Sequence, residues 1–275
     1  MIRLIASDLD GTLIPEGTQE IEPGFMEVLE ELLDRGYLFC AASGRQYANM
    51  QRIFEGFRDR MVFVCENGAL AMENGEQKYI LEIPRDRVNA IAEDILSFPE
   101  TEICLSGVKA CYIQPRTEWF EHQLFHVLKN KCEIFETLDE IDDTIVKIAA
   151  YIHDFSENGK RIQTILNEKY GEYAKFVMGG NDWLDMIVNH SGKGLALEAI
   201  LEQKGLKTNE IMVFGDNQND ISMLELTPNS YAMAHAAEDV KKHAGHTCVS
   251  VTETLREFFL TSNNCYGIMD VNEIS

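Results

Sequence analysis

A nearly continuous apolar run at the start of the chain ends abruptly in two carboxylates. Residues 2–6 are apolar apart from Arg3, and Asp8 and Asp10 follow almost at once. A strand that is buried on both faces of a parallel sheet shows such a run, and it delivers its polar residues at its carboxyl end. We therefore predict a central parallel strand here, with both acids at the edge of the sheet where ligands bind.

Strand-like and helix-like segments alternate on both sides of a middle stretch that has a different pattern. Helical spacing at residues 25–33 is followed by an apolar run at residues 37–42, and a third apolar run ends at Cys65. The alternation returns with a helix-like segment at residues 193–204 and an apolar run at residues 211–214. Short units of this kind predict a parallel sheet with helices on both faces.

The middle stretch mixes short strands and helices and places no carboxylate at a strand end, which is typical of a separate α+β domain. The expected fold class is therefore α/β, with a Rossmann-like doubly wound parallel-sheet core and an inserted α+β domain. We place the core at residues 1–81 and 185–275 and the insertion at residues 82–184. One interrupted core explains the pattern better than two domains in series.

The charge balance excludes several classes of partner. The chain has 46 Asp and Glu against 24 Lys and Arg, for a net charge of -22. Such a surface repels phosphate backbones and anionic lipids, and no apolar stretch approaches the roughly 20 residues of a membrane span. We expect no nucleic-acid or membrane partner and a cytoplasmic location, so an anionic substrate would need a local site with a metal and a few cations.

The cysteines indicate neither a disulfide framework nor a zinc ribbon, because their number is odd and they form no C-x-x-C pair. We interpret them as reduced and mostly structural. They are Cys40, Cys65, Cys104, Cys111, Cys132, Cys248 and Cys265.

The hexapeptide after the first strand, D-L-D-G-T-L from Asp8 to Leu13, resembles the first signature of the haloacid dehalogenase superfamily. A bare D-x-D would also suit a loop start with capping acids. The resemblance implies that Asp8 is a nucleophile and Asp10 a general acid and base. It also implies Mg²⁺, bound by the Asp8 side chain and the Asp10 backbone carbonyl. A carboxylate that attacks a phosphate dianion needs such a cation between them.

Two further elements of the resemblance hold the phosphate. Ser43, Gly44 and Arg45 follow the second expected strand, where the family binds a phosphate oxygen through a hydroxyl and a backbone amide. For Arg45 the sequence allows two roles: its side chain either binds the substrate or pairs with a carboxylate of the core. Lys193 stands at a helix start and would neutralise the phosphate and the nucleophile. A Walker A loop is excluded, since it needs a glycine where the chain has Ile187.

The last element is G-D-N-Q-N-D, from Gly215 to Asp220, at the end of the apolar run 211–214. It resembles the family's G-D-x-x-N-D. The resemblance implies that Asp216 completes the metal shell and that Asn219 binds phosphate. It also implies that Asp220 supports the metal or orients Lys193. Asp220 can in addition cap the next helix, and this role is compatible with the other two.

The position of the insertion, between Arg45 and Lys193, resembles the Cof-type subclass IIB phosphatases, in which an α+β cap closes over the core. The expected enzyme is a phosphoric monoester hydrolase: a Mg²⁺-dependent phosphatase of small phosphomonoesters, such as sugar phosphates or phosphorylated cofactors, that forms an aspartyl-phosphate. The alternatives are a phosphotransferase or mutase at the same site, or a non-catalytic binding protein. Both a monomer and a homodimer remain open.

Overall fold

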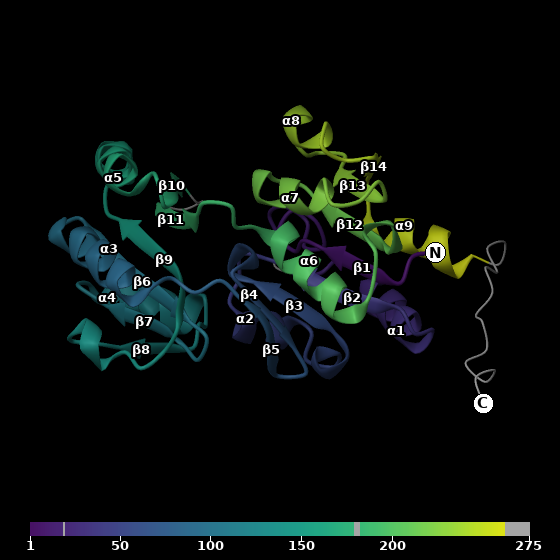
Figure 1. Cartoon of the computed structure of the whole chain (residues 1–275), viewed down its shortest axis with the longest axis horizontal. Coiled ribbons are helices and arrows are strands. Elements are labelled where there is room, and N and C mark those ends of the chain that lie inside the picture. Colours follow the sequence, from purple (N-terminus) through teal and green to yellow (C-terminus); the bar gives the residue numbers. More distant parts are fainter. Residues whose placement is uncertain (19, 179–181, 262–275) are drawn as a thin grey trace.

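Two β-sheets lie side by side along the long axis of the molecule (Figure 1). The computed structural model describes residues 1–18, 20–178 and 182–261. The strand order is β14-β13-β12-β1-β2-β3-β4-β5 in the first sheet and β10-β11-β9-β6-β7-β8 in the second. The first sheet combines strands from before and after the second one, so the chain leaves the core once and returns to it.

The first sheet is parallel from β14 to β3 and ends in the antiparallel strands β4 and β5. Its central strand β1 is buried along its whole length, as the apolar run predicts. The strands are β1 (Leu4–Ser7), β2 (Leu38–Ala42), β3 (Val62–Cys65), β4 (Leu70–Glu73), β5 (Glu76–Ile80), β12 (Ile211–Gly215), β13 (Ser230–Met233) and β14 (His246–Cys248).

Helices cover both faces of this sheet, and β1 contributes to both cores. Ile5 packs in a cluster with α1 (Phe25–Asp34), α2 (Tyr47–Ile53) and α9 (Val251–Leu255). Leu4 and Ala6 point to the opposite face. The helices on that face are α6 (Lys193–Lys204), α7 (Ile221–Leu224) and α8 (Glu238–Lys241). This is the doubly wound α/β core that the sequence predicts.

The second sheet is mostly antiparallel, and its helices also lie on both faces. One face packs on α3 (Arg85–Ser97) and α5 (Phe155–Tyr170), and the other on α4 (Glu118–His122) with the π-helical turn Gln123–Val127. The strands are β6 (Thr101–Gly107), β7 (Cys111–Gln114), β8 (Cys132–Ile134), β9 (Ile145–Ile152), β10 (Ala174–Met178) and β11 (Trp183–Val188).

The expected boundary at residues 184 and 185 falls inside a strand of the second sheet. β11 pairs with β9 and β10 and continues to Val188, so this sheet ends later in the chain than we predicted from the sequence. The charged residue Asp185 made the strand hard to recognise, because it interrupts an apolar run. The division of the chain into a core and a domain at residues 82–184 stays a prediction.

Six cysteines lie among the described residues and all six are free thiols, while Cys265 lies outside the described residues. Within residues 1–18, 20–178 and 182–261, no helix is both long enough and apolar enough to cross a bilayer.

Candidate active site

Three neighbouring parallel strands end at the same edge of the first sheet, and each is followed by a predicted site residue. β1 lies between β12 and β2, and Ser7 is in register with Phe214 on one side and Ala41 on the other. Asp8 follows β1, Ser43 follows β2 and Asp216 follows β12. The carboxyl ends of such strands form the usual ligand edge of a doubly wound sheet.

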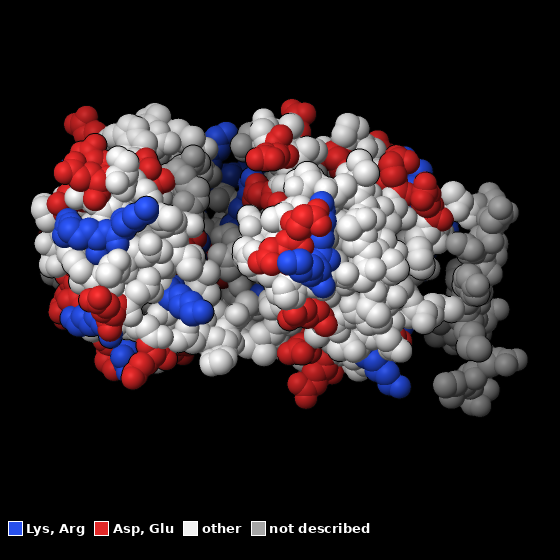
Figure 2. All heavy atoms as spheres, turned by 90° about the horizontal axis from the view of Figure 1, so that it is seen from above, with Lys and Arg blue, Asp and Glu red and all other residues white. Residues whose placement is uncertain are grey.

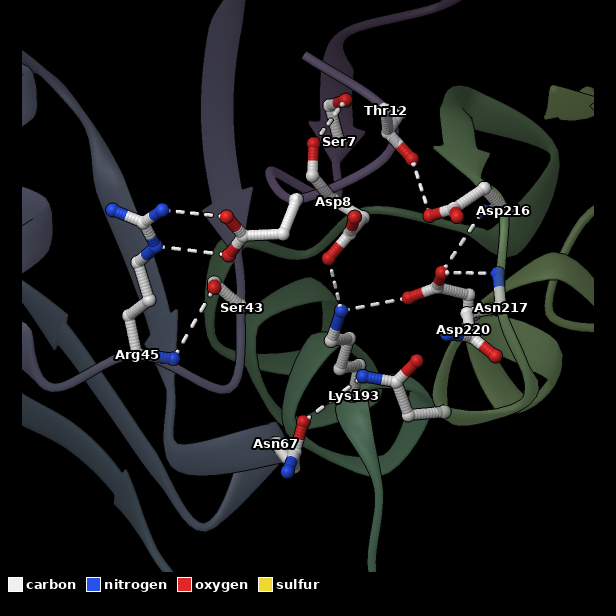
Figure 3. A network of polar contacts seen from close by, with 12 residues as sticks. Ser7, Asp8, Thr12, Ser43, Arg45, Asn67, Lys193, Asp216, Asn217 and Asp220 are labelled. Carbon is white, nitrogen blue, oxygen red and sulfur yellow. Dashed lines mark hydrogen bonds and ion pairs between the residues drawn. The ribbon is translucent and has the colours of Figure 1, made fainter. Parts of the chain in front are cut away.

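Lys193, the first residue of α6, lies fully buried between two acids. Its Nζ donates to Asp8 Oδ1 at 2.5 Å and to Asp220 Oδ1 at 2.7 Å (Figure 3). A buried cation of this kind is tolerated only when it is paired and hydrogen-bonded. The structure therefore brings together Asp8, Lys193 and Asp220, which are far apart in the sequence.

Asp8, Asp216 and Asp220 form an acidic group in which one oxygen of each lies within 4.8 Å of the others. Asp8 Oδ2 is buried and accepts no hydrogen bond from the described residues. Mg²⁺ prefers oxygen ligands and binds through one or two carboxylates while it keeps several waters. The unpartnered oxygen beside two further acids therefore fits a divalent cation.

Asp220 has hydrogen bonds to both of its oxygens. While Oδ1 accepts from Lys193, Oδ2 accepts from the backbone N–H groups of Asp216 and Asn217, at 3.0 Å each. This geometry caps the turn that leads into α7 and orients Lys193. Both of these roles were considered from the sequence, and in the structure they occur together.

Asp10 does not belong to the acidic group. Its side chain is paired with Arg45, whose Nε donates to Oδ2 at 2.8 Å and whose Nη2 donates to Oδ1 at 2.5 Å. Arg45 thus pairs with a carboxylate, one of its two predicted roles. Metal binding by the Asp10 backbone carbonyl stays a prediction.

The predicted phosphate-binding residues surround the same edge. Ser43 is buried, and its Oγ accepts from the backbone N–H of Arg45 at 3.2 Å. Asn219 donates to the side chain of Asn67 at 3.0 Å, and Asn67 also contacts Gly44 so closely that a side chain at Gly44 would meet it. Figure 3 draws this network of polar contacts, with Ser43, Arg45 and Asn67 around Asp8 and Lys193.

Two residues of this network had not been singled out as site residues. Thr12 donates to Asp216 Oδ1 at 3.0 Å and so fixes that carboxylate. Asn67 comes two positions after the end of β3, the next parallel strand in the sheet. Ligands bind beyond the carboxyl ends of parallel strands. Asn67 could have been found by searching the end of β3 for site residues, as the ends of β1 and β2 were searched.

Gly68 allows two loops of the site to touch. It has a positive φ of 94°, and a Cβ on it would overlap the backbone carbonyl of Gly192. Only glycine combines this backbone conformation with such a close approach. The contact sets the position of the loop just before Lys193 relative to Asn67.

Burial and the neighbouring charges shift the pKa values of the site residues. Burial raises the pKa of Asp8 to about 8; Lys193 opposes this rise, whereas Asp220 and Asp216 add to it. Burial and the charge of Asp220 also raise the pKa of Asp216. Burial alone would lower the pKa of Lys193, but Asp220 and Asp8 outweigh it and raise that pKa. A divalent cation would relieve the repulsion among the acids.

The fold thus places a buried lysine and a group of three acids at the carboxyl ends of neighbouring parallel strands. The family model for haloacid dehalogenase-like hydrolases matches residues 5–254, and the chain belongs to this family. The match covers both sheets, so the resemblance inferred from short motifs extends across nearly the whole chain.

Named relatives agree with this assignment. The 5-amino-6-(5-phospho-D-ribitylamino)uracil phosphatase YbjI of Escherichia coli is 27% identical, over 98% of this chain and 94% of its own. The crystal structure of TM0651 from Thermotoga maritima has a TM-score of 0.83 at 24% identity, and covers 97% of this chain and 100% of its own. The subclass IIB sugar phosphatase BT4131 has a TM-score of 0.75 at 22% identity, covering 93% and 98%. The predicted class, a phosphoric monoester hydrolase of this superfamily, is confirmed.

Proposed function

We propose that this protein is a Mg²⁺-dependent phosphatase that hydrolyses small phosphomonoesters through a phosphoryl group carried on Asp8. The observation that supports this best is the environment of Asp8. One of its oxygens contacts Lys193, and the other is buried without a partner among the described residues, beside Asp216 and Asp220. Such an acid is available to a cation and to an incoming phosphate.

In this proposal Asp8 attacks phosphorus and the aspartyl-phosphate is then hydrolysed by water. Covalent catalysis divides one difficult displacement into two easier ones, which suits phosphate monoesters because they react very slowly in water. Bound Mg²⁺, held by Asp8, Asp216 and Asp220 with the backbone of Asp10, would neutralise charge between the nucleophile and the phosphate. Lys193 contributes a second positive charge at the same carboxylate.

Asp10 is the proposed general acid and base. It would protonate the leaving oxygen in the first step and accept a proton from water in the second. In the structure its carboxylate is held by two hydrogen bonds from Arg45. Binding of the substrate phosphate near Arg45 would compete for these donors and release Asp10 for proton transfer.

Ser43, Gly44, Lys193 and Asn219 are proposed to hold the phosphate. They offer a hydroxyl, a backbone N–H, an ammonium group and an amide around one strand edge. All four groups can donate hydrogen bonds to an anion. They would attract the phosphate at short range, although the net charge of -22 repels it at long range. The partner is accordingly a small phosphomonoester, and the phosphoribityl compound named for the relative YbjI belongs in a substrate panel.

The test is phosphate release from sugar phosphates, phosphoribityl compounds and cofactor phosphates, with Mg²⁺ or with EDTA. We expect turnover of at least one substrate with Mg²⁺ and a fall of at least about a hundredfold in EDTA, since a metal contributes several kcal/mol to such transition states. Transfer of phosphate to a second sugar rather than to water would favour the phosphotransferase. Tight binding without release would favour the binding protein.

A further inference from the structure

A cavity of about 250 Å³ lies between the two sheets, next to the proposed phosphate site. A groove between the two parts of the molecule is visible in the space-filling view (Figure 2). Gly44 and Arg45 line the cavity on the core side, and Lys147 of β9 and Asp185 of β11 line it on the opposite side. A group attached to a phosphate at Gly44 would therefore extend toward Lys147 and Asp185.

Lys147 contacts one carboxylate of its own sheet and one on the other side of the cavity. Its Nζ lies 3.2 Å from Asp185 Oδ2 and 3.7 Å from Glu66 Oε2, and Glu66 belongs to the core loop after β3. The side chains of Lys147 and Glu66 are 15% and 4% exposed. Burial alone would lower the pKa of Lys147, but the two carboxylates more than offset this and raise it. The lysine thus stays charged in a half-enclosed site.

The charges that line the cavity cancel. Its charged lining residues among those described are Arg45, Lys147, Glu66 and Asp185, and both cations already contact a carboxylate. The partner of Arg45 is Asp10. A leaving group with a second anion would meet Glu66 and Asp185 and find each lining cation already paired, so it would bear a repulsion that a neutral group avoids.

The cavity also offers hydrogen-bond partners beside an apolar wall. Asp185 keeps 21% of its side chain exposed and can accept from hydroxyl groups, which is a strong contact because the acceptor is charged. Leu124 and Trp183 line the same cavity. Two further lining residues contact each other: the side-chain amide of Asn49, on α2, donates to Oδ1 of Asn130 at 2.6 Å. This hydrogen bond links the core to the part of the chain that contains the second sheet. This lining suits a leaving group that consists of a carbon chain with several hydroxyl groups.

We propose that Lys147 and Asp185 are specificity-determining residues that select a neutral, polyhydroxylated leaving group and reject one with a second anionic group. This inference rests on the proposed function, because it identifies the residues that contact the leaving group of the same phosphomonoester. Asp185 accepts hydrogen bonds from the hydroxyls, and Lys147 donates one while it fixes Asp185. Glu66 keeps the local charge at zero.

The test compares sorbitol phosphate with phosphogluconate, which share a hydroxylated chain but end in a hydroxymethyl group and a carboxylate. The wild type should prefer sorbitol phosphate by at least about tenfold in kcat/KM. Asp185→Asn removes one negative charge and weakens the contact to hydroxyls, so the preference should fall by at least about tenfold. Lys147→Gln makes the lining negative, and the preference should rise instead.

Two controls make the outcome specific. Glu133→Gln removes the same charge from an exposed position of β8 outside the cavity and should leave the preference unchanged. Para-nitrophenyl phosphate, whose leaving group has no hydroxyl chain, is the second control: its kcat/KM in each variant measures any general loss of activity, separately from the preference between the two polyol substrates. Equal preferences in the wild type and both cavity variants would refute the inference while the phosphatase stands. Absence of release from every phosphomonoester by the wild type would refute the proposed function and the inference with it.

Discussion

Asp8→Asn is expected to abolish phosphate release, with a loss of at least about 10⁴-fold in kcat, because the amide cannot act as the nucleophile. The substitution keeps the shape of the side chain, and Lys193 keeps its contact with Asp220. The measurement is turnover of the best substrate of the panel with Mg²⁺. The matched control is Asp239→Asn, which changes an exposed acid of α8 and should retain full activity.

The same variant has an expected effect on stability that shows whether it is folded. The pKa of Asp8 is raised from 3.8 to about 8 by burial, so in EDTA the folded state holds a proton there that the unfolded chain has lost. This contribution to stability is complete at low pH and is lost as pH rises toward 8. Relative to Asp8→Asn, the wild type should lose stability over this range. A difference that does not change with pH would contradict the proposed environment of Asp8.

Lys193→Met is expected to remove activity and to lower the free energy of unfolding by about 3 kcal/mol in EDTA, because it leaves buried acids without their cation. Lys193 is fully buried and contacts both Asp8 and Asp220. The measurement is denaturant unfolding of wild type and variant. Added Mg²⁺ should restore part of the stability, since a cation that binds only the folded state stabilises it.

The control for this variant lies on the same helix. Lys204 ends α6 and pairs with Glu73 at 2.7 Å, with side chains that are 21% and 20% exposed. Partly exposed pairs contribute about 1 kcal/mol or less, so Lys204→Met should change stability little and activity not at all. Equal destabilisation by the two substitutions would mean that Lys193 is not the buried counter-charge of the site.

The sequence predicted the core and the strand-end residues because both depend on local patterns. The apolar run before Asp8 places that residue at the end of a buried strand, and the run before Asp216 does the same. Parallel pairing of β1 with β12 then brings the two acids to one edge. Because both strands are buried on both faces, each must end close to the first charged residue after its apolar run.

Contacts that depend on side-chain direction or on distant strands could not be predicted in this way. The pairing of Arg45 with Asp10 was one of two open roles, and only the geometry distinguishes them. Lys147 interrupts an otherwise apolar strand, and its partners Glu66 and Asp185 are distant in the chain. The contact between Lys147 and Asp185 depends on the pairing of β9 with β11, and the contact with Glu66 depends on how the two sheets pack, and no short motif records either.

In the proposed mechanism Asp8 carries the phosphoryl group. Rapid acid quenching during turnover, followed by peptide mass spectrometry, measures this directly. The proposal predicts a base-labile phosphoryl group on the peptide that contains Asp8, with Mg²⁺ and substrate present, and its absence in Asp8→Asn. Efficient phosphate release by the wild type with no phosphorylated peptide at any quench time, or with the label on another residue, would contradict it.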